Sequence, residues 1–183
     1  MGALGWFETA SERLRKGVQL WIMSTPLYLP QKMGYLRSTW PGLNPREVVV
    51  FNSWLLLHYN EYTAMDFNVR IGNGSDPLPT MTDPEKVQWK MNTQKRIDCL
   101  AYKDSQAEII EVKDRAEIRV VGQISMYSIL WLQDNPGALK PVLRIVANRA
   151  DSDVLFTAAA SGIRVDLVEA DFSGLSKKTA PTV

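Results

Sequence analysis

A predicted β-hairpin near the middle of the chain constrains the fold more than any other feature. Two short apolar segments flank residues 103–106, whose sequence Lys-Asp-Ser-Gln has the composition of a turn. The first segment carries Asp98, and the second carries Glu111 and Lys113. Side chains two residues apart in a strand point to the same face, so Glu111 and Lys113 emerge together. The hairpin therefore brings Asp98 beside them from the neighbouring strand.

These three side chains have the chemistry of a phosphodiester-cleaving site. Two carboxylates from adjacent strands form an all-oxygen site of the kind that Mg²⁺ prefers, with water and substrate phosphate completing it. A nearby ammonium group can orient or deprotonate the attacking water and offset charge in the transition state. An acidic-x-Lys triplet also occurs often by chance. The alternative is a surface hairpin on which Glu111 and Lys113 form a weak ion pair.

The hairpin residues resemble the PD-(D/E)xK nuclease superfamily. Asp98 matches the metal-binding aspartate of that family, and the triplet Glu111, Val112 and Lys113 matches its acidic-x-Lys motif. Ile97 stands where the eponymous proline would be, a replacement that the superfamily often tolerates. The resemblance implies that Asp98 and Glu111 hold a metal ion with help from the Val112 carbonyl. It also implies that Lys113 positions the attacking water.

Two residues on the helix predicted to follow the hairpin extend the resemblance. Gln123 and Tyr127 share a helix face and match a Gln-x-x-x-Tyr signature of RecB-like branches. The resemblance implies that they hold the substrate backbone or brace the catalytic lysine. The alternative is a half-buried helix face on which both side chains hydrogen-bond to a loop. In all, the resemblance covers roughly residues 43 to 168.

The resemblance implies an α/β fold, with a restriction-endonuclease-like mixed central sheet flanked by helices and preceded by an N-terminal helical extension. A length of 183 residues suits one compact domain. We expect a helical and proline-rich extension over residues 1–42, with a helix at 8–24. We also expect a nuclease-like core over residues 43–170 and a polar tail over 171–183. Within the core, a strand-helix-strand pattern after residue 140 predicts a parallel strand pair.

A helix start is predicted at residues 44–47, whose sequence is Asn-Pro-Arg-Glu. Asn44 can cap the helix, and Pro45 suits its first position. Glu47 has two open roles. It completes a capping box, and an acidic residue on this helix often supplements the metal site in the superfamily.

Residues 72–94 have the composition of a loop-rich insert that contains basic residues and Trp89. Such a loop either touches a nucleic-acid backbone or is a solvated connection. The net charge of +1 provides no global case for nucleic-acid binding, so any contact requires local clustering of Lys and Arg.

Cysteine and histidine are too scarce for common structural sites. One Cys excludes an internal disulfide, and with a single His a structural zinc site is not expected. We expect His58 to cap or pack near a helix end.

No apolar run reaches the length of a membrane span, and the first residues lack the order of a secretory signal. We therefore expect no membrane contact and a cytoplasmic location, or a place within a virion if the protein is phage-encoded.

Two functions from different classes follow. The first is a phosphodiester hydrolase that acts on DNA and depends on Mg²⁺ or Mn²⁺. The alternative is a nuclease-fold structural or adaptor subunit of a phage particle, at head completion or the neck, with or without residual nuclease activity. In that case residues 1–42, rich in proline and tryptophan, would mediate a homo-oligomer or a larger assembly.

Overall fold

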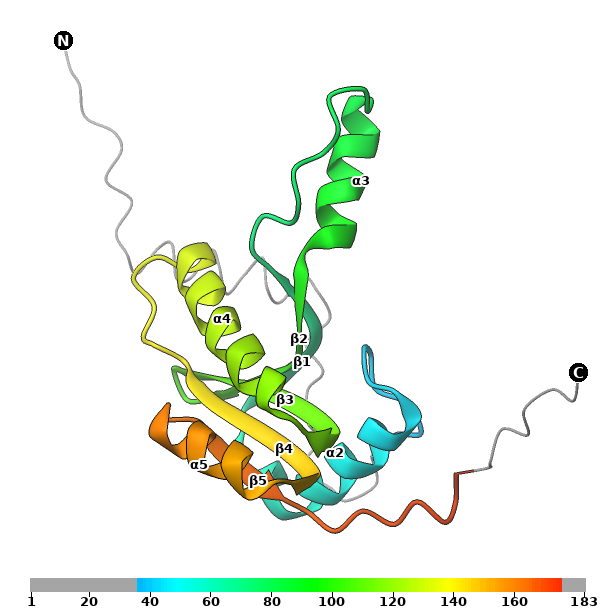
Figure 1. The fold of residues 1–183 in the computed structure, drawn as a ribbon, viewed down its shortest axis with the longest axis vertical. Coiled ribbons are helices and arrows are strands. Elements are labelled where there is room, and N and C mark those ends of the chain that lie inside the picture. The colour runs from blue at the N-terminus through cyan, green and yellow to red at the C-terminus, as the bar shows by residue number, and fades with distance from the viewer. Residues whose placement is uncertain (1–35, 176–183) are drawn as a thin grey trace, which may run out of the picture.

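The structure is a computed structural model that describes residues 36–175. Five strands form one mixed sheet flanked by helices (Figure 1). The elements in chain order are α2 (Pro45–His58), η1 (Tyr59–Glu61), β1 (Ala64–Ile71), α3 (Asp83–Thr93), β2 (Lys95–Lys103), β3 (Gln106–Ala116), α4 (Ile118–Asp134), β4 (Val142–Ala150), α5 (Ser152–Ala160) and β5 (Arg164–Leu167). The helix predicted at 8–24 lies outside the described residues. None of the helices described combines the length and apolar character needed to cross a membrane.

The strands lie in the order β1-β2-β3-β4-β5. The first three pair antiparallel, whereas β3, β4 and β5 pair parallel, with α4 and α5 as the crossover helices. The β2–β3 hairpin closes with Lys103 opposite Gln106. Asp104, at the turn, has a φ of +55°, a conformation that Asp tolerates better than most residues. The predicted hairpin and the predicted parallel pair are both confirmed.

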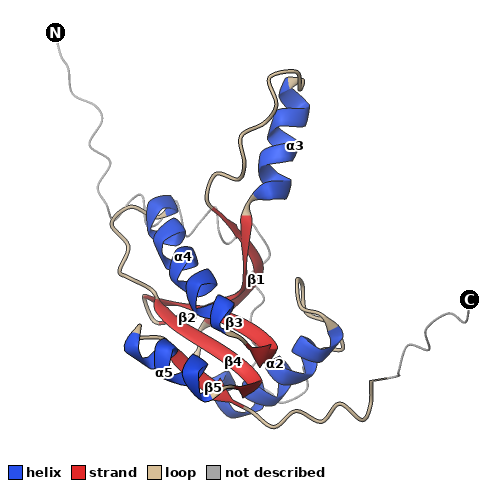
Figure 2. Ribbon diagram, in the orientation of Figure 1, coloured by secondary structure: helices blue, strands red, loops and turns tan. Residues whose placement is uncertain are grey.

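Helices cover both faces of the sheet (Figure 2). Each face has its own apolar core. Residues of α4 and α5 pack on one face, and α2 packs on the other. Neighbouring residues of β3 illustrate the division, because Ile109 belongs to the α4 side and Ile110 to the α2 side. Both are fully buried. Burying such a side chain contributes about 1.5–3 kcal/mol, so the two cores hold the sheet in place from both sides.

Trp40 belongs to the core on the α2 side. It is 3% exposed, and its ring stacks on Phe67 at 4.5 Å between centroids. The same ring meets Phe51 edge-on at 5.4 Å, and its indole nitrogen donates to Asn52 at 2.8 Å. The predicted boundary after residue 42 therefore places one core residue in the extension, and the packed domain begins earlier than expected.

The expectation of a loop-rich insert over 72–94 is wrong for the residues that form α3. The Glu85 carboxylate accepts hydrogen bonds from the Thr82 amide and hydroxyl, both at 2.7 Å, and Pro84 lies in the first turn. This Thr-x-x-Glu pattern is a helix-start signal that the sequence contains. No residue of α3 is buried, and the helix projects away from the sheet (Figure 1).

Candidate functional site

The candidate site lies at a fork where β2 leaves β3. The last paired residues of these two strands are Cys99 and Ile110, and beyond them residues 95–97 of β2 pair with β1 alone. At the fork the Asp98 carboxylate accepts a hydrogen bond of 2.9 Å from the Val112 amide. A side chain thus takes the place of a backbone acceptor, and the carboxylate is fixed where the strands separate.

Asn68 marks the same level on the outer strand. It lies across from Asp98, between two regular pairs of the β1–β2 ladder, and its φ is +56°. Phe67 packs on the α2 side and Val69 on the α4 side, although residues two apart in a regular strand share a face. Left-handed backbone is uncommon outside glycine, and Asn adopts it more readily than most residues. This irregularity rotates the outer part of the β1–β2 ribbon relative to the sheet.

The Lys113 ammonium occupies the centre of the fork. Its Nζ lies 2.8 Å from Glu111 Oε1, 2.9 Å from the Val112 carbonyl oxygen and 3.2 Å from Asp98 Oδ2. Glu47 Oε1 is 3.8 Å away on α2. Burial opposes this charge, but Asp98 and Glu111 together raise the pKa of Lys113 above its ordinary value. The side chain is therefore a cation held among oxygen atoms at neutral pH.

Glu111 is the most buried charged group of the cluster, with 1% of its side chain exposed. Burial first, and the neighbouring Asp98 charge second, raise its pKa to about 8 against the opposing effect of Lys113. Its Oε2 atom is buried and has no hydrogen-bond partner within residues 36–175. Leaving such an acceptor unpaired is costly, so this oxygen marks a position where a cation or a donor would be stabilising.

Glu47 performs both of the roles that were open for it. Its Oε2 accepts a hydrogen bond of 2.9 Å from the Asn44 amide, which closes the capping box of α2. Its other carboxylate oxygen faces Lys113. Burial raises the pKa of Glu47, and the hydrogen bond from Asn44 lowers it in part. The start of α2 thus delivers a third carboxylate to the edge of the fork.

Gln123 and Tyr127 share one face of α4 and lie behind Glu111. The Gln123 amide nitrogen donates to Glu111 Oε1 at 2.6 Å and to the Tyr127 hydroxyl at 2.8 Å. Tyr127 is 5% exposed. Among residues 36–175, the pair hydrogen-bonds neither directly to Lys113 nor to a loop, and contact with the substrate backbone stays a prediction. Within the described structure, the two residues orient the buried carboxylate.

All the predicted site residues therefore meet at one fork. The oxygen atoms available to a divalent cation are those of Asp98, Glu111 and the Val112 carbonyl, with Glu47 alongside. Among residues 36–175, no three or more His, Cys, Asp or Glu side chains are grouped closely enough to hold a metal ion. Lys113 occupies the space between the carboxylates instead. The sequence pattern predicted that Asp98, Glu111 and Lys113 would lie together, but it contained no signal for Asn68.

A second polar cluster lies apart from the fork, at the amino ends of β3 and β4. There the buried Arg144 guanidinium bonds to Glu108 and to Asp166, and these contacts raise its pKa although burial opposes the charge. His58 stacks on Trp54 at 4.8 Å between centroids. This agrees with the packing role expected for the histidine. Each charged group in this cluster has a partner, so its contacts account for it as a structural tie between strands.

Comparison with known proteins identifies no family. No protein-family model and no curated protein matches the chain. Among solved structures, it is similar to the crystal structure of the "protein of unknown function AF1548", with 16% sequence identity and a TM-score of 0.40. The match covers 67% of this chain and 57% of that one, so the chain spans little more than half the length of that protein. A likeness at this level defines neither a family nor an activity.

Proposed function

We propose that the protein is a metal-dependent phosphodiester hydrolase that acts on DNA, with a restriction-endonuclease-like core of the PD-(D/E)xK type. The observation that carries the proposal is the convergence of two carboxylates on one lysine at the fork between β2 and β3. Asp98 and Glu111 both lie within 3.2 Å of the Lys113 ammonium nitrogen. A surface ion pair explains this arrangement poorly, because Glu111 is almost fully buried and one of its oxygens has no partner among residues 36–175.

The donor atoms fit a hard divalent cation such as Mg²⁺ or Mn²⁺. Three oxygens already surround one positive charge, the Lys113 ammonium, and Glu111 Oε2 adds an unsatisfied acceptor. Asp98, Glu111 and the Val112 carbonyl would hold the ion, with Glu47 supplementing them. When bound, such an ion polarises a phosphate oxygen and lowers the pKa of water.

The residues of the chain supply the remaining parts of the chemistry. Lys113 keeps its proton because its pKa is raised, so it acts as a donor that orients water or offsets negative charge, not as a base. Gln123 fixes the orientation of Glu111 through its hydrogen bond at 2.6 Å. The Val112 amide does the same for Asp98. Each acidic group is thus positioned before substrate arrives, as electrostatic catalysis requires.

Incubation of the purified full chain with linear, circular and branched DNA tests the proposal directly. Parallel reactions contain Mg²⁺, Mn²⁺ or EDTA, and a single-stranded RNA serves as the competing substrate class. The informative variant is Asp98→Asn, which removes the charge but keeps an oxygen to accept from the Val112 amide. Asp104→Asn is its matched control, because Asp104 lies in the exposed turn of the same hairpin and Asn tolerates the φ of +55° found there.

We expect cleavage with Mg²⁺ or Mn²⁺, none with EDTA, and a loss of at least about a hundredfold in Asp98→Asn, the scale on which single electrostatic groups act in catalysis. The Asp104→Asn protein should cleave like the parent. A folded Asp98→Asn protein that cuts at the parental rate would exclude the assignment. So would cleavage that EDTA does not affect. Cleavage of RNA alone would reassign the substrate class.

A further inference from the structure

The outer part of the β1–β2 ribbon forms an arm, defined here as residues 70–96. Its strands leave the sheet at the fork, since beyond Cys99 the strand β2 no longer pairs with β3. The arm carries α3, none of whose residues is buried, and it projects from the domain (Figure 1). The root of the arm is anchored by Ile71, which is 2% exposed and belongs to the core on the α4 side. Beyond this anchor the helix buries no side chain, so it contributes little to folding and its surface is left to contact other molecules.

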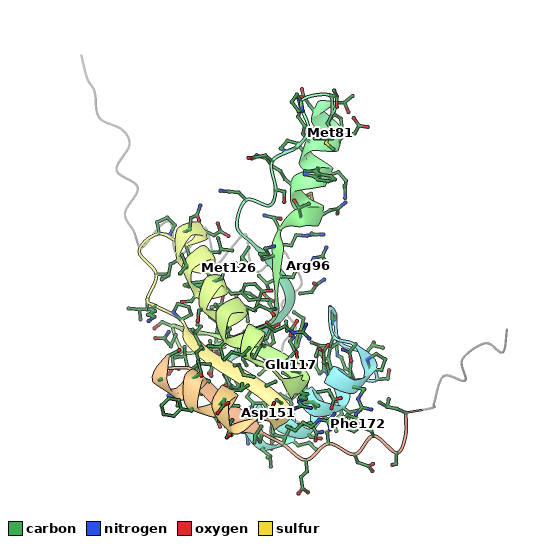
Figure 3. The ribbon with its side chains drawn as sticks, in the orientation of Figure 1. Met81, Arg96, Glu117, Met126, Asp151 and Phe172 are labelled. Atoms are coloured by element: carbon green, nitrogen blue, oxygen red, sulfur yellow. The ribbon has the colours of Figure 1, made fainter. Side chains whose placement is uncertain are left out.

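Charge is distributed unevenly along the arm. The arm carries five basic and three acidic residues: Arg70, Lys86, Lys90, Lys95 and Arg96 against Asp76, Asp83 and Glu85. Figure 3 shows Met81 at the far end of the arm and Arg96 at its root, beside the sheet. Asp83 and Glu85 begin α3 near that far end, where Lys86 pairs with Asp83 at 3.2 Å. The remaining four basic residues lie toward the root. Of the three acidic residues only Asp76 lies on this side, next to Ser75, whose amide donates to Thr93 at the end of α3.

These four root residues, Arg70, Lys90, Lys95 and Arg96, are exposed. None of them forms an ion pair with another residue of the described range 36–175. Unpaired exposed cations are common singly, but four at the base of one projection concentrate positive charge on a chain whose net charge is only +1. The local clustering that nucleic-acid contact requires is therefore present at the root of the arm.

Arg70 and Arg96 face each other directly across the β1–β2 ladder. Like charges at directly opposed positions destabilise a strand pair, so this pairing costs stability in the isolated protein. The single polar contact described for either guanidinium is a bond of 3.3 Å from Arg96 to the Asn68 side chain. Two guanidinium groups at this spacing suit an anion that both can reach, and phosphate is the anion that arginine forks match in geometry.

The position of this pair relates it to the fork. Arg96 precedes Asp98 by two residues of the same strand, which is about 7 Å at the rise of an extended chain. Phosphates along one strand of a duplex follow each other at roughly 3.4 Å of axial rise. A strand with a phosphate at the carboxylate cluster therefore presents the second phosphate further along, at about 7 Å of axial rise, at the level of Arg96.

We propose that the root of the arm, formed by Arg70, Lys90, Lys95 and Arg96, binds the phosphate backbone of a polynucleotide that runs from the fork along the arm. This inference deepens the proposed function, on which it rests for the class of substrate. It assigns the arm to backbone contact that is independent of base sequence. Binding should accordingly weaken with salt in proportion to the number of phosphates contacted.

The test is binding of a fluorescein-labelled DNA duplex to the full chain, followed by anisotropy in EDTA so that no cleavage occurs. The arm variant is Arg70→Gln with Arg96→Gln. Its matched control is Lys140→Gln with Arg164→Gln, which removes two exposed cations that are likewise unpaired among residues 36–175 and lie outside the arm. Each charge-assisted bond lost corresponds to roughly a tenfold loss of affinity, and the salt slope should fall by about one for each contact.

We expect the arm variant to bind at least about tenfold more weakly, with its salt slope reduced by about two, and the control to bind like the parent. The arm variant should melt no lower than the parent, because it loses the repulsion between Arg70 and Arg96. Equal losses in the two variants would overturn the proposal. The proposal would also be overturned if polyglutamate displaced the labelled duplex as effectively as unlabelled DNA. The arm would then recognise negative charge in general and not phosphate.

A labelled RNA in parallel distinguishes the two sources of the same phosphate chemistry. Stronger binding of RNA, with the same loss in the arm variant, would support the arm and identify its polynucleotide. The outcomes for the arm and for the hydrolase separate cleanly. A protein that binds DNA through the arm but never cleaves it refutes only the hydrolase. If the protein cleaves DNA and the arm variant binds DNA as tightly as the parent, only the proposal for the arm is refuted.

Discussion

The backbone amide of Val112 donates a hydrogen bond of 2.9 Å to the carboxylate of Asp98 at the level where β2 separates from β3. The same carboxylate lies 3.2 Å from the Lys113 ammonium. One side chain therefore completes the strand pairing and defines the candidate site. Its loss would leave a buried amide without an acceptor, at a cost of about 1–3 kcal/mol. This is why Asp98→Asn separates chemistry from folding better than Asp98→Ala does.

Replacement of Lys113 by Met should destabilise the protein and sensitise it to divalent cations. The change removes the only cation described within 4 Å of Asp98, Glu111 and Glu47 in the range 36–175. Removing one partner of a buried pair costs about 3–5 kcal/mol. We expect the lower end, because Lys113 is a quarter exposed and because Glu111, with a pKa of about 8, can take up a proton.

Thermal unfolding with Mg²⁺ or EDTA measures the effect. Mg²⁺ should raise the melting temperature of Lys113→Met more than that of the parent, because the ion replaces the missing positive charge. Lys103→Met is the control, since Lys103 is exposed and reaches Glu61 only at 3.9 Å, where a pair contributes about 0–1 kcal/mol. If Lys113→Met melts at the same temperature as the parent and Mg²⁺ does not change that temperature, the fork has no requirement for a cation.

Local patterns in the sequence were sufficient to predict the hairpin at the centre of the fold. The turn at 103–106 and the apolar segments on either side predicted the β2–β3 hairpin, and the period-two rule placed Glu111 and Lys113 on one face. The carboxylate from the neighbouring strand followed from the same register. These features depend on residues close in the sequence, which is why they could be predicted without a structure.

Features that depend on tertiary context could not be predicted in this way. The left-handed conformation of Asn68 arises where two strands separate, and no turn composition announces it. The hydrogen bond from Gln123 to Glu111 was not predicted, because only the packing of α4 on β3 brings the two residues close. The helix α3 is a different case, because its start signal at Thr82 was present and the surrounding loop composition obscured it.

Asn68 should accept Gly but not Val. Its φ of +56° costs a non-glycine residue about 1–2 kcal/mol, and a β-branched side chain suffers most. We therefore expect Asn68→Val to lower the free energy of unfolding by at least that amount and to reduce cleavage by displacing Asp98, which lies across the ladder. Asn68→Gly should retain more of both. Urea unfolding and cleavage rates measured on the two variants would decide, and equal behaviour would mean that the left-handed conformation does not shape the site.

Asp66 should make the stability depend on pH in a defined window. Burial raises the pKa of this half-buried residue of β1 from 3.8 to about 6. Between these two values the folded protein holds the proton more tightly than the unfolded chain, so the free energy of unfolding falls as the pH rises and is constant above the window. Asp66→Asn, which is neutral throughout, should melt higher than the parent at pH 7–8 and match it below about pH 4. Asp76→Asn, in an exposed loop, controls for net charge; a parallel shift in both variants would contradict the assignment.

Trp40 tests where the packed domain begins. If the domain starts before residue 43, Trp40→Ala should remove a ring that is 3% exposed and stacks on Phe67, at a cost of about 3–5 kcal/mol. Trp89→Ala is the matched control, because Trp89 lies on α3, is 39% exposed and should change stability by no more than about 0.5 kcal/mol. Urea denaturation of the full chain gives both values. An order-of-magnitude difference would assign Trp40 to the core on the α2 side, whereas two small and equal effects would return it to the extension and leave that core to α2 and the sheet.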